Sequence, residues 1–209
     1  MLTVYGYPQT RSSRITWMLE ELGQDYTYEL IDFMKGQHKS AEYLAINPGG
    51  KVPAFKDDEL LLTESAAIVT YLGDKFGRHD LVPAAGSTDR ARYEQWAYFA
   101  LCELEQGLWN MSKHRFALPS DKRVKELLPT ASWEFQQALE LLSQGLGDND
   151  YILGDSFSAA DILLGHSLFW GLSFKQPIEQ KNLQTYIDRL RARPAVSQYQ
   201  AREQASLNA

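Results

Sequence analysis

The spacing of apolar residues changes once along this chain, and this change restricts the folds that the chain can adopt. Up to about residue 80, short runs rich in β-branched and aromatic residues alternate with segments in which apolar residues recur every three or four positions. Alternating strands and helices produce this pattern. After the stretch LVPAAGST, only the helical spacing continues. The sequence therefore predicts an α/β domain over residues 1–80, a linker over 81–88 and an all-helical domain over 89–209.

The first domain is predicted to follow the order βαβ and then ββα. Its expected elements are strands over residues 2–7 and 26–33, helices over 15–22 and 41–45, a hairpin over 51–64 and a helix over 65–76. The first helix is expected to end at Gly23, because glycine readily adopts the left-handed conformation of a helix C-terminus. The hairpin consists of KVPAF and ELLLTE, with Asp57 and Asp58 as its short acidic turn.

In the second half of the chain, apolar stripes predict several helices. One stripe runs through residues 93–108 and a second through residues 124–142, where Pro129 is expected to cause a kink or a break. The segment GDSFSAADILLG predicts a helix start, because Ser158 can cap the helix while Asp161 occupies the reciprocal position of a capping box. A helix over residues 182–192 and a short tail helix complete this domain.

Charge and cysteine content argue against several classes of function. The chain carries 21 Lys and Arg against 27 Asp and Glu, a formal net charge of −6, and no basic run interrupts this balance, so we expect no nucleic-acid partner. No apolar run approaches the ~20 residues that span a bilayer, and no signal peptide is recognisable, so we expect a cytoplasmic protein with no membrane partner. The single cysteine, Cys102, has no disulfide partner and is expected to be packed; no metal site is predicted.

Two pairs of neighbouring residues in the first domain suit ligand binding, although each pair also has a purely structural explanation. Pro53 can simply begin an edge strand, but a cis peptide bond between Val52 and Pro53 would turn the Val52 backbone outward to pair with an extended peptide ligand. Glu64 and Ser65 suit a helix start, where an acidic residue and a cap are favoured. At the same place, backbone N–H groups and the Ser65 hydroxyl would hold a carboxylate, and Glu64 would hold an ammonium group.

The segment TRSSR, which opens the first helix, supplies hydroxyl groups that can stabilise a ligand thiolate. Thr10, Ser12 and Ser13 are all suitable helix caps, so local structure alone also accounts for them. A thiol with a pKa of about 8.5 is mostly protonated near neutral pH, and lowering this pKa by two requires about 2.7 kcal/mol. One hydrogen bond to a charged group contributes about 1.5 to 3 kcal/mol, and the helix dipole adds up to about 1 kcal/mol. Together, these two contributions are large enough to lower the thiol pKa by two without a general base.

These features occur together in one order, and that order resembles the glutathione transferase superfamily. The resemblance spans nearly the whole chain, with INPGGKVPAF and LTESAAIVTYL in a thioredoxin-like first domain and with GDSFSAADILL and DRLRARPAV in the all-helical domain. The stretch TRSSRITWMLEELG is similar to the bacterial and fungal branch, in which a Ser/Thr-Arg dipeptide precedes an Arg and a Trp on the first helix. The resemblance implies a cytoplasmic homodimer that acts in detoxification.

The resemblance also implies how glutathione would bind, as a co-substrate and without a metal. Val52 before a cis Pro53 would pair with the cysteinyl unit. Glu64 and Ser65 would hold the γ-glutamyl end. The residues implied to face the glycyl carboxylate are His38, Lys39 and Lys51.

The catalytic position is the point at which this sequence departs from the family pattern. The residue that falls on the family's serine is Thr10, and neither residue 9 nor residue 10 is the cysteine of the disulfide-forming members. Activation of the glutathione thiol is therefore left to Thr10, Arg11 or Ser12. Tyr5, at the end of the first strand, is an alternative. We expect Thr10 Oγ1 or nearby N–H groups to donate to the thiolate, and Arg11 to add positive potential.

The implied reaction is attack of the glutathione thiolate on a small hydrophobic electrophile. The resemblance places this second substrate between the domains, with Trp109 and Phe116 as candidate pocket residues. It places dimer contacts on the helix after Ser65 and on the helix over residues 93–108. Two alternatives stay open: glutathione-dependent reduction of peroxides or disulfides, and a non-enzymatic interaction or regulatory protein that keeps the fold.

Overall fold

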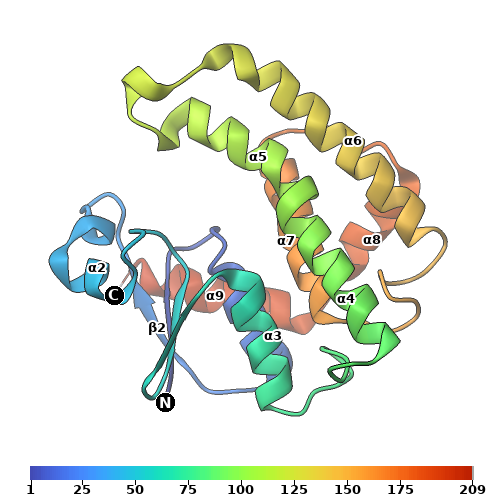
Figure 1. Ribbon diagram of the computed structural model, residues 1–209, viewed down its shortest axis with the longest axis horizontal. Coiled ribbons are helices and arrows are strands. Elements are labelled where there is room, and N and C mark those ends of the chain that lie inside the picture. Colours follow the sequence, from blue (N-terminus) through green and yellow to red (C-terminus); the bar gives the residue numbers. More distant parts are fainter. Residues whose placement is uncertain (209) are drawn as a thin grey trace. The chain divides into compact units, whose positions relative to one another are not determined.

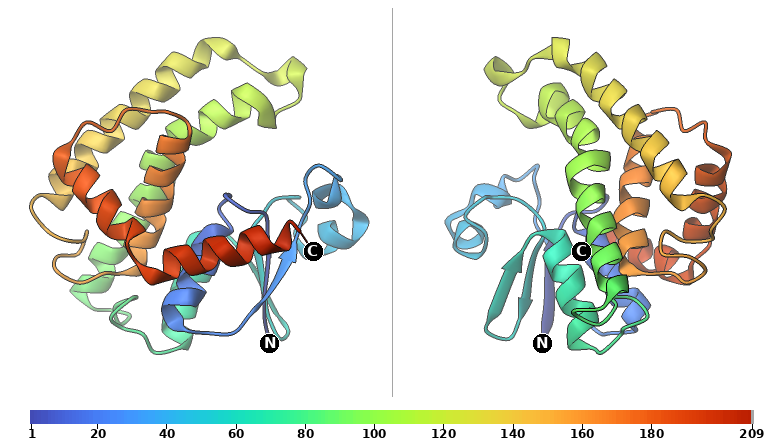
Figure 2. Two further views of the ribbon diagram at one scale, coloured as in Figure 1. Left: turned by 180° about the vertical axis from the view of Figure 1, so that it is seen from behind. Right: turned by 45° about the vertical axis from the view of Figure 1, so that its right-hand side comes forward.

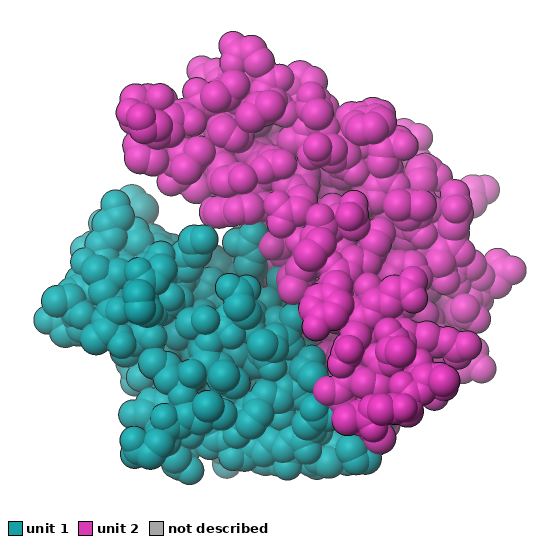
Figure 3. All heavy atoms as spheres, viewed as in Figure 1, with its two compact units in different colours: residues 1–79, 191–209 teal, residues 80–190 magenta. Residues whose placement is uncertain are grey.

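The computed structural model describes residues 1–208, which fall into two compact units. Figure 1 shows the ribbon, and Figure 3 colours the units. The first unit consists of Met1–His79 together with the described residues from 191 onward, and the second consists of Asp80–Leu190. The sequence assigns the final helix to the helical domain, whereas the structure groups it with the first unit. The predicted domain boundaries stay a prediction.

The first unit is built around a four-stranded mixed sheet with the strand order β2-β1-β3-β4. Its elements are β1 (Leu2–Gly6), α1 (Ser13–Leu22), β2 (Thr27–Leu30), the 3-10 turn η1 (Gln37–Lys39), α2 (Ala41–Ile46), β3 (Ala54–Asp57), β4 (Leu60–Thr63), α3 (Ser65–Lys75) and α9 (Pro194–Ser206). β1 pairs with β2 in parallel and with β3 antiparallel, and β3 pairs antiparallel with β4. The predicted thioredoxin-like fold and its order βαβ-ββα are confirmed.

The core of the first unit lies between this sheet and its helices. Val4 and Phe55 are partners across β1 and β3, and both are fully buried. α1 packs against α3 on one side and against α9 on the other, and Figure 2 shows α9 beside α1. Trp17 of α1 stacks on Tyr199 of α9 with 5.9 Å between ring centroids. The last helix is therefore an integral part of this core.

The hairpin turn lies one residue further along the chain than the sequence predicts. Asp57 is the last residue of β3 and is buried, because its carboxylate accepts hydrogen bonds from Lys75 and Tyr71 of α3. The bond from Lys75 holds the pKa of Asp57 below its ordinary value. The turn falls at Asp58, with φ 50°, and Glu59. A tertiary partner thus overrides the local turn signal.

The second unit consists mainly of helices, as predicted. Its elements are α4 (Thr88–Phe99), the π-helical turn η2 (Ala100–Leu104), α5 (Glu105–Ser112), a second π-helical turn η3 (Lys113–Ala117), the 3-10 turns η4 (Ser120–Lys122) and η5 (Lys125–Leu127), α6 (Leu128–Leu146), α7 (Ala159–Ser173) and α8 (Lys181–Arg191). The predicted capping box is present at the start of α7, where Ser158 N donates to Asp161 Oδ2 at 2.8 Å. This local signal fixes where the buried helix of the unit begins.

Three expectations for the second unit need correction. Pro129 does not kink a helix. It lies in the first turn of α6, where a missing N–H removes no intrahelical hydrogen bond, so the expected helix is interrupted just before it, where α6 begins. Val124 therefore precedes the helix and is exposed. Cys102 is exposed on the π-helical turn η2 and is not packed, contrary to the prediction.

Candidate ligand-binding site

The sheet register gathers most of the predicted site residues of the first unit at one end of the sheet. Tyr5 is the partner of Ala54 across β1 and β3, and Ala54 is the partner of Thr63 across β3 and β4. The segment after β1, the segment before β3 and the segment after β4 therefore leave the sheet at the same end. These segments carry residues 10–12, 51–53 and 64–65.

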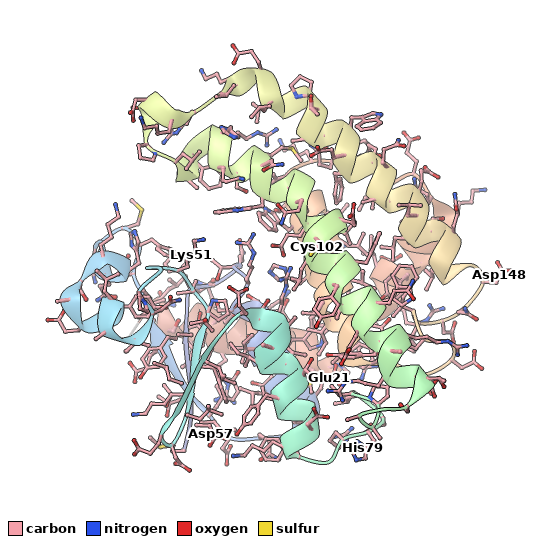
Figure 4. The ribbon with its side chains drawn as sticks, viewed as in Figure 1. Glu21, Lys51, Asp57, His79, Cys102 and Asp148 are labelled. Carbon is pink, nitrogen blue, oxygen red and sulfur yellow. The ribbon has the colours of Figure 1, made fainter. Side chains whose placement is uncertain are left out.

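The loop before β3 presents a stretch of backbone that is fixed in place. The Val52–Pro53 peptide bond is cis, as predicted. Lys51, labelled in Figure 4, lies in this loop, and its carbonyl oxygen accepts hydrogen bonds from Tyr43 Oη at 2.6 Å and Asn47 Nδ2 at 2.7 Å. These two bonds fix the peptide plane that also carries the Val52 N–H. Within residues 1–208, the Val52 backbone itself makes no hydrogen bond, so it can pair with a ligand backbone.

The turn η1 lies against the same loop. A Cβ atom on Gly50 would be 2.8 Å from the carbonyl oxygen of His38, and φ of Gly50 is 58°, so this position requires glycine. The His38 ring packs edge-on to Phe33 with 4.9 Å between centroids, and its Nδ1 atom is buried without a hydrogen-bond partner in the described part of the chain. Lys39 and Lys51 are exposed. The structure thus brings η1 and the Lys51 loop together, with cationic groups on both.

Ser65 begins α3 and is paired with a buried cation. Arg14 of α1 has no exposed surface, and its Nη1 donates to Ser65 Oγ at 3.0 Å. Arg14 uses only a lone pair of the hydroxyl, so the Ser65 proton is left to donate to another group. The guanidinium and the N-terminus of α3 both create positive potential here. The combination suits a ligand carboxylate.

Glu64 immediately precedes this anion site. Its φ is 67° and its ψ 108°, a backbone conformation that non-glycine residues rarely adopt. Such strained positions concentrate at ligand-binding sites. The Glu64 side chain is exposed, so its carboxylate is accessible to a ligand ammonium group.

The hydroxyl groups between β1 and α1 bond mainly to their own segment. Thr10 Oγ1 and Ser12 Oγ both donate to the Tyr7 carbonyl, at 2.7 Å and 2.9 Å, and the two hydroxyls lie 2.9 Å apart. Ser12 Oγ also accepts from Tyr7 N at 3.1 Å, and Ser12 has no exposed surface. Thr10 and Arg11 are partly exposed. Of the three predicted catalytic residues, a ligand can therefore reach Thr10 and Arg11, while Ser12 supports the turn.

Sequence reasoning misses four residues that support this region. They are Arg14, Tyr43, Asn47 and Glu203. For two of them, the sequence holds a pattern that could have identified them. Arg14 lies four residues before the buried Met18, and Glu203 lies four residues after the buried Tyr199, so each is on the apolar face of its helix. A charged residue at such a position needs a partner. For Tyr43 and Asn47, no comparable pattern exists.

The groups at this end of the sheet are backbone amides, hydroxyls, cations and one exposed carboxylate. This set suits a peptide with charged groups at its ends. Within residues 1–208, no three His, Cys, Asp or Glu side chains form a group that could hold a metal ion. In the same range, no helix is both long enough and apolar enough to cross a membrane.

The fold and site define a thioredoxin-like binding domain joined to a helical domain, and comparisons with known proteins identify the family. The family model for the glutathione S-transferase N-terminal domain matches residues 1–74. The model for the glutathione S-transferase C-terminal domain matches residues 103–194. The chain belongs to the glutathione S-transferase family, which confirms the resemblance seen in the sequence.

The similarity to individual relatives extends over most of the length of both chains. Glutathione S-transferase GstA of Escherichia coli O157:H7 is 30% identical over 188 residues, which cover 88% of this chain and 89% of that protein. A glutathione transferase structure from Methylococcus capsulatus has a TM-score of 0.87 at 26% identity, covering 98% of this chain and 100% of that one. The glutathione transferase URE2P6 of Phanerochaete chrysosporium, solved in complex with oxidized glutathione, has a TM-score of 0.86 at 25% identity, covering 98% and 96%.

Proposed function

We propose that this chain is a glutathione transferase that binds glutathione at the end of the sheet in its first unit and transfers the thiolate to small electrophiles. The curated relatives are named glutathione S-transferases, and a structural neighbour is described with oxidized glutathione. The observation that carries the proposal is the combination of two contacts. The fixed Lys51 carbonyl orients the Val52 backbone, and the buried Arg14 backs the Ser65 hydroxyl.

In the proposed complex, each part of the tripeptide meets groups of matching chemistry. The cysteinyl backbone pairs with Val52 in the manner of an added strand. The γ-glutamyl carboxylate accepts from Ser65 and the N-terminus of α3, and its ammonium group meets Glu64. The residues proposed to face the glycyl carboxylate are His38, Lys39 and Lys51.

Thr10 is the proposed donor to the glutathione thiolate. Its hydroxyl donates to the Tyr7 carbonyl, but Ser12 Oγ donates to the same carbonyl. Thr10 can therefore rotate toward a thiolate without leaving that carbonyl unsatisfied. The N-terminus of α1 adds up to about 1 kcal/mol, and binding orients the sulfur for attack. The electrophile accepts the sulfur electron pair, and its leaving group departs with the bonding electrons.

Thr10→Val should raise the pKa of bound glutathione by about 1 to 2, because it removes a hydrogen bond worth about 1.5 to 3 kcal/mol to a charged group. We expect kcat/KM at neutral pH to fall by about tenfold or more. The thiolate absorbance of the bound ligand, titrated against pH, measures the first effect. Thr3→Val, the same chemical change at a buried site in β1, is the matched control. Unchanged thiol pKa and turnover in both Thr10→Val and Arg11→Ala would overturn the assignment.

Ser65→Ala should weaken glutathione binding by about 10- to 100-fold, because the ligand carboxylate loses a hydrogen bond from a neutral donor backed by Arg14. Calorimetry measures the dissociation constant. Cysteinylglycine, which lacks the γ-glutamyl group, should bind wild type and variant equally. Ser112→Ala, which removes another buried hydroxyl, should leave both affinities unchanged. An equal loss for both ligands would place the carboxylate elsewhere.

Retention on a glutathione-affinity column is the first test of the whole proposal. If the protein flows through and millimolar glutathione gives no heat in calorimetry, the proposal of an enzyme fails. The alternative, a non-enzymatic interaction or regulatory protein that keeps the fold, then takes its place. A panel of an aryl halide, an organic hydroperoxide and a mixed disulfide then separates the reactions. We expect turnover of the aryl halide, whereas turnover of only the other two would favour the reductase alternative.

The proposed physiological setting is detoxification by a cytoplasmic homodimer. We place the dimer contacts on α3 and on the helices over residues 93–108, and sedimentation at micromolar concentration should show a dimer. The residues proposed to contact the electrophile are Trp109 and Phe116. Phe116 is 60% exposed and lies edge-on to Phe174 with 6.3 Å between centroids, so it offers an aromatic surface.

A further inference from the structure

We propose that Glu203, on the last helix of the chain, is a positioning residue that holds residues 9–16 in their working geometry through three hydrogen bonds. We call residues 9–16 the activation segment. The inference rests on the proposed function, because thiol activation is placed in this segment. The three bonds hold the backbone and side chains on either side of the proposed donors.

The geometry of the tether is specific. Glu203 Oε2 accepts from Gln9 N at 3.3 Å and from Ser13 Oγ at 2.9 Å, and Oε1 accepts from Thr16 Oγ1 at 2.8 Å. Glu203 is only 2% exposed. A carboxylate is removed from water at a large energetic cost unless donors replace its hydration. Here all three donors come from one short segment, so α9 and the activation segment are joined at this point.

The tether acts at a strained point of the backbone. Gln9 has φ 59°, in the left-handed region, which is unfavourable for a non-glycine residue. Its N–H in this conformation points to Glu203, so the carboxylate favours the strained form. Thr10 and Arg11 lie between Gln9 and Ser13, the two positions that share Oε2. Both ends of the proposed activating dipeptide are therefore fixed.

Other contacts hold α9 along α1 but lie away from the activation segment. Arg193 makes a bidentate ion pair with Glu21, with distances of 2.6 Å and 2.7 Å, and Arg202 Nε donates to Glu20 at 2.9 Å. Figure 4 labels Glu21. These pairs lie near the C-terminal end of α1. A change at Glu21 therefore loosens the same helix pair without removing a bond to the activation segment.

The charge of Glu203 is set by its surroundings. Burial raises its pKa to about 7, and the bonds from Thr16, Ser13 and Gln9 oppose this effect. Its charge also interacts with three tyrosines: Tyr26 and Tyr28 on the β2 side and Tyr199 on α9. Hydrogen bonds to an ionised acceptor are stronger than those to a neutral one. The tether therefore tightens as pH rises through about 7.

Two variants separate the effect of the three hydrogen bonds to Glu203 from the effect of its negative charge. Glu203→Ala removes all three acceptors. Glu203→Gln keeps the shape: its oxygen can face Gln9 and Ser13, while its amide donates to Thr16, whose hydroxyl lies 3.2 Å from the Ser13 carbonyl and can donate there. In Glu203→Ala we expect hydrogen exchange at the amides of residues 9–13 to accelerate about tenfold or more, and kcat to fall about tenfold with a smaller change in the KM for glutathione. Below about pH 7, where Glu203 is itself mostly protonated, Glu203→Gln should largely keep both.

Glu21→Gln is the matched control, which should lower stability but leave the exchange of residues 9–13 and the pKa of the bound thiol unchanged. If Glu203→Ala does not fold, the pH profile of kcat carries the test: Glu203→Gln should lose a component near pH 7 that wild type shows. Two results would overturn the inference and leave the proposed function intact. One is a Glu203→Ala variant that loses only stability, and the other is identical pH profiles of kcat for wild type and Glu203→Gln. Absence of glutathione binding in wild type would instead overturn the proposed function.

Discussion

Asp161→Ala is expected to lower the free energy of unfolding by about 3 to 5 kcal/mol. Asp161 has no exposed surface, and its carboxylate accepts from Ile152 N at 2.9 Å, from Ser158 N and Oγ at 2.8 Å each, and from Tyr186 Oη at 2.6 Å. Alanine leaves these buried donors without an acceptor, at about 1 to 3 kcal/mol for each group that cannot reach another partner. Because the free energy of unfolding of a folded domain is only about 5 to 15 kcal/mol, this single change removes a large part of it.

Urea unfolding followed by circular dichroism measures the effect. Asp161→Asn should lose less, because its oxygen still accepts from Tyr186 and Ile152, while its amide opposes the Ser158 N–H. Asp155→Ala, an exposed aspartate in the same loop, is the control and should change stability by less than about 0.5 kcal/mol. Equal stability of Asp161→Ala and Asp155→Ala would show that the capping network contributes little.

The parts of the fold that follow from the sequence are those with local causes. The capping box at Ser158 and Asp161 needs only a three-residue spacing, and the C-terminal stop of α1 at Gly23 needs only a residue that accepts φ 63°. The element order of the first unit follows from the change between strand and helix periods. In each case the information lies within one turn or one strand, so it can be read along the chain.

The sequence pattern is least informative where a contact that forms only on folding decides the outcome. Asp57 looks like a turn residue, but Lys75 and Tyr71 of α3 draw it into β3. Ser12 looks like an accessible hydroxyl, but the turn folds it onto Tyr7 and buries it. Neither outcome has a signal in the neighbouring residues, because the deciding group becomes adjacent only after the chain has folded.

In the candidate site, too, some features follow from local sequence and others depend on contacts that form only on folding. The positions Val52, Glu64 and Ser65 follow from motifs, since each lies at the start or end of a recognisable element. Their supporting contacts do not follow: Arg14 meets Ser65 across 51 positions, and Glu203 meets Gln9 across 194. The positions of the candidate site residues can therefore be proposed from the sequence, whereas the contacts that hold them in place cannot.

The buried position of Glu203 leads to a second large effect, on the pH dependence of stability. Burial raises the pKa of Glu203 from 4.5 to about 7, so between these values the folded chain binds more protons than the unfolded chain. Stability attributable to this group is therefore fully present below about pH 4.5 and is lost as pH rises through about 7. The loss amounts to about 3 kcal/mol, since one pH unit corresponds to about 1.4 kcal/mol for one proton.

Glu203→Gln removes this titration while keeping the size of the side chain, so its advantage over wild type should grow with pH. The difference in unfolding free energy between variant and wild type should be constant below about pH 4.5, rise by up to about 3 kcal/mol by pH 8, and then level off. Taking the difference cancels groups common to both proteins, including Asp161, whose pKa burial also raises. Urea titrations at half-unit pH intervals measure it. A difference that stays constant from pH 5 to pH 8 would mean that Glu203 ionises at its ordinary pKa and that its carboxylate reaches water.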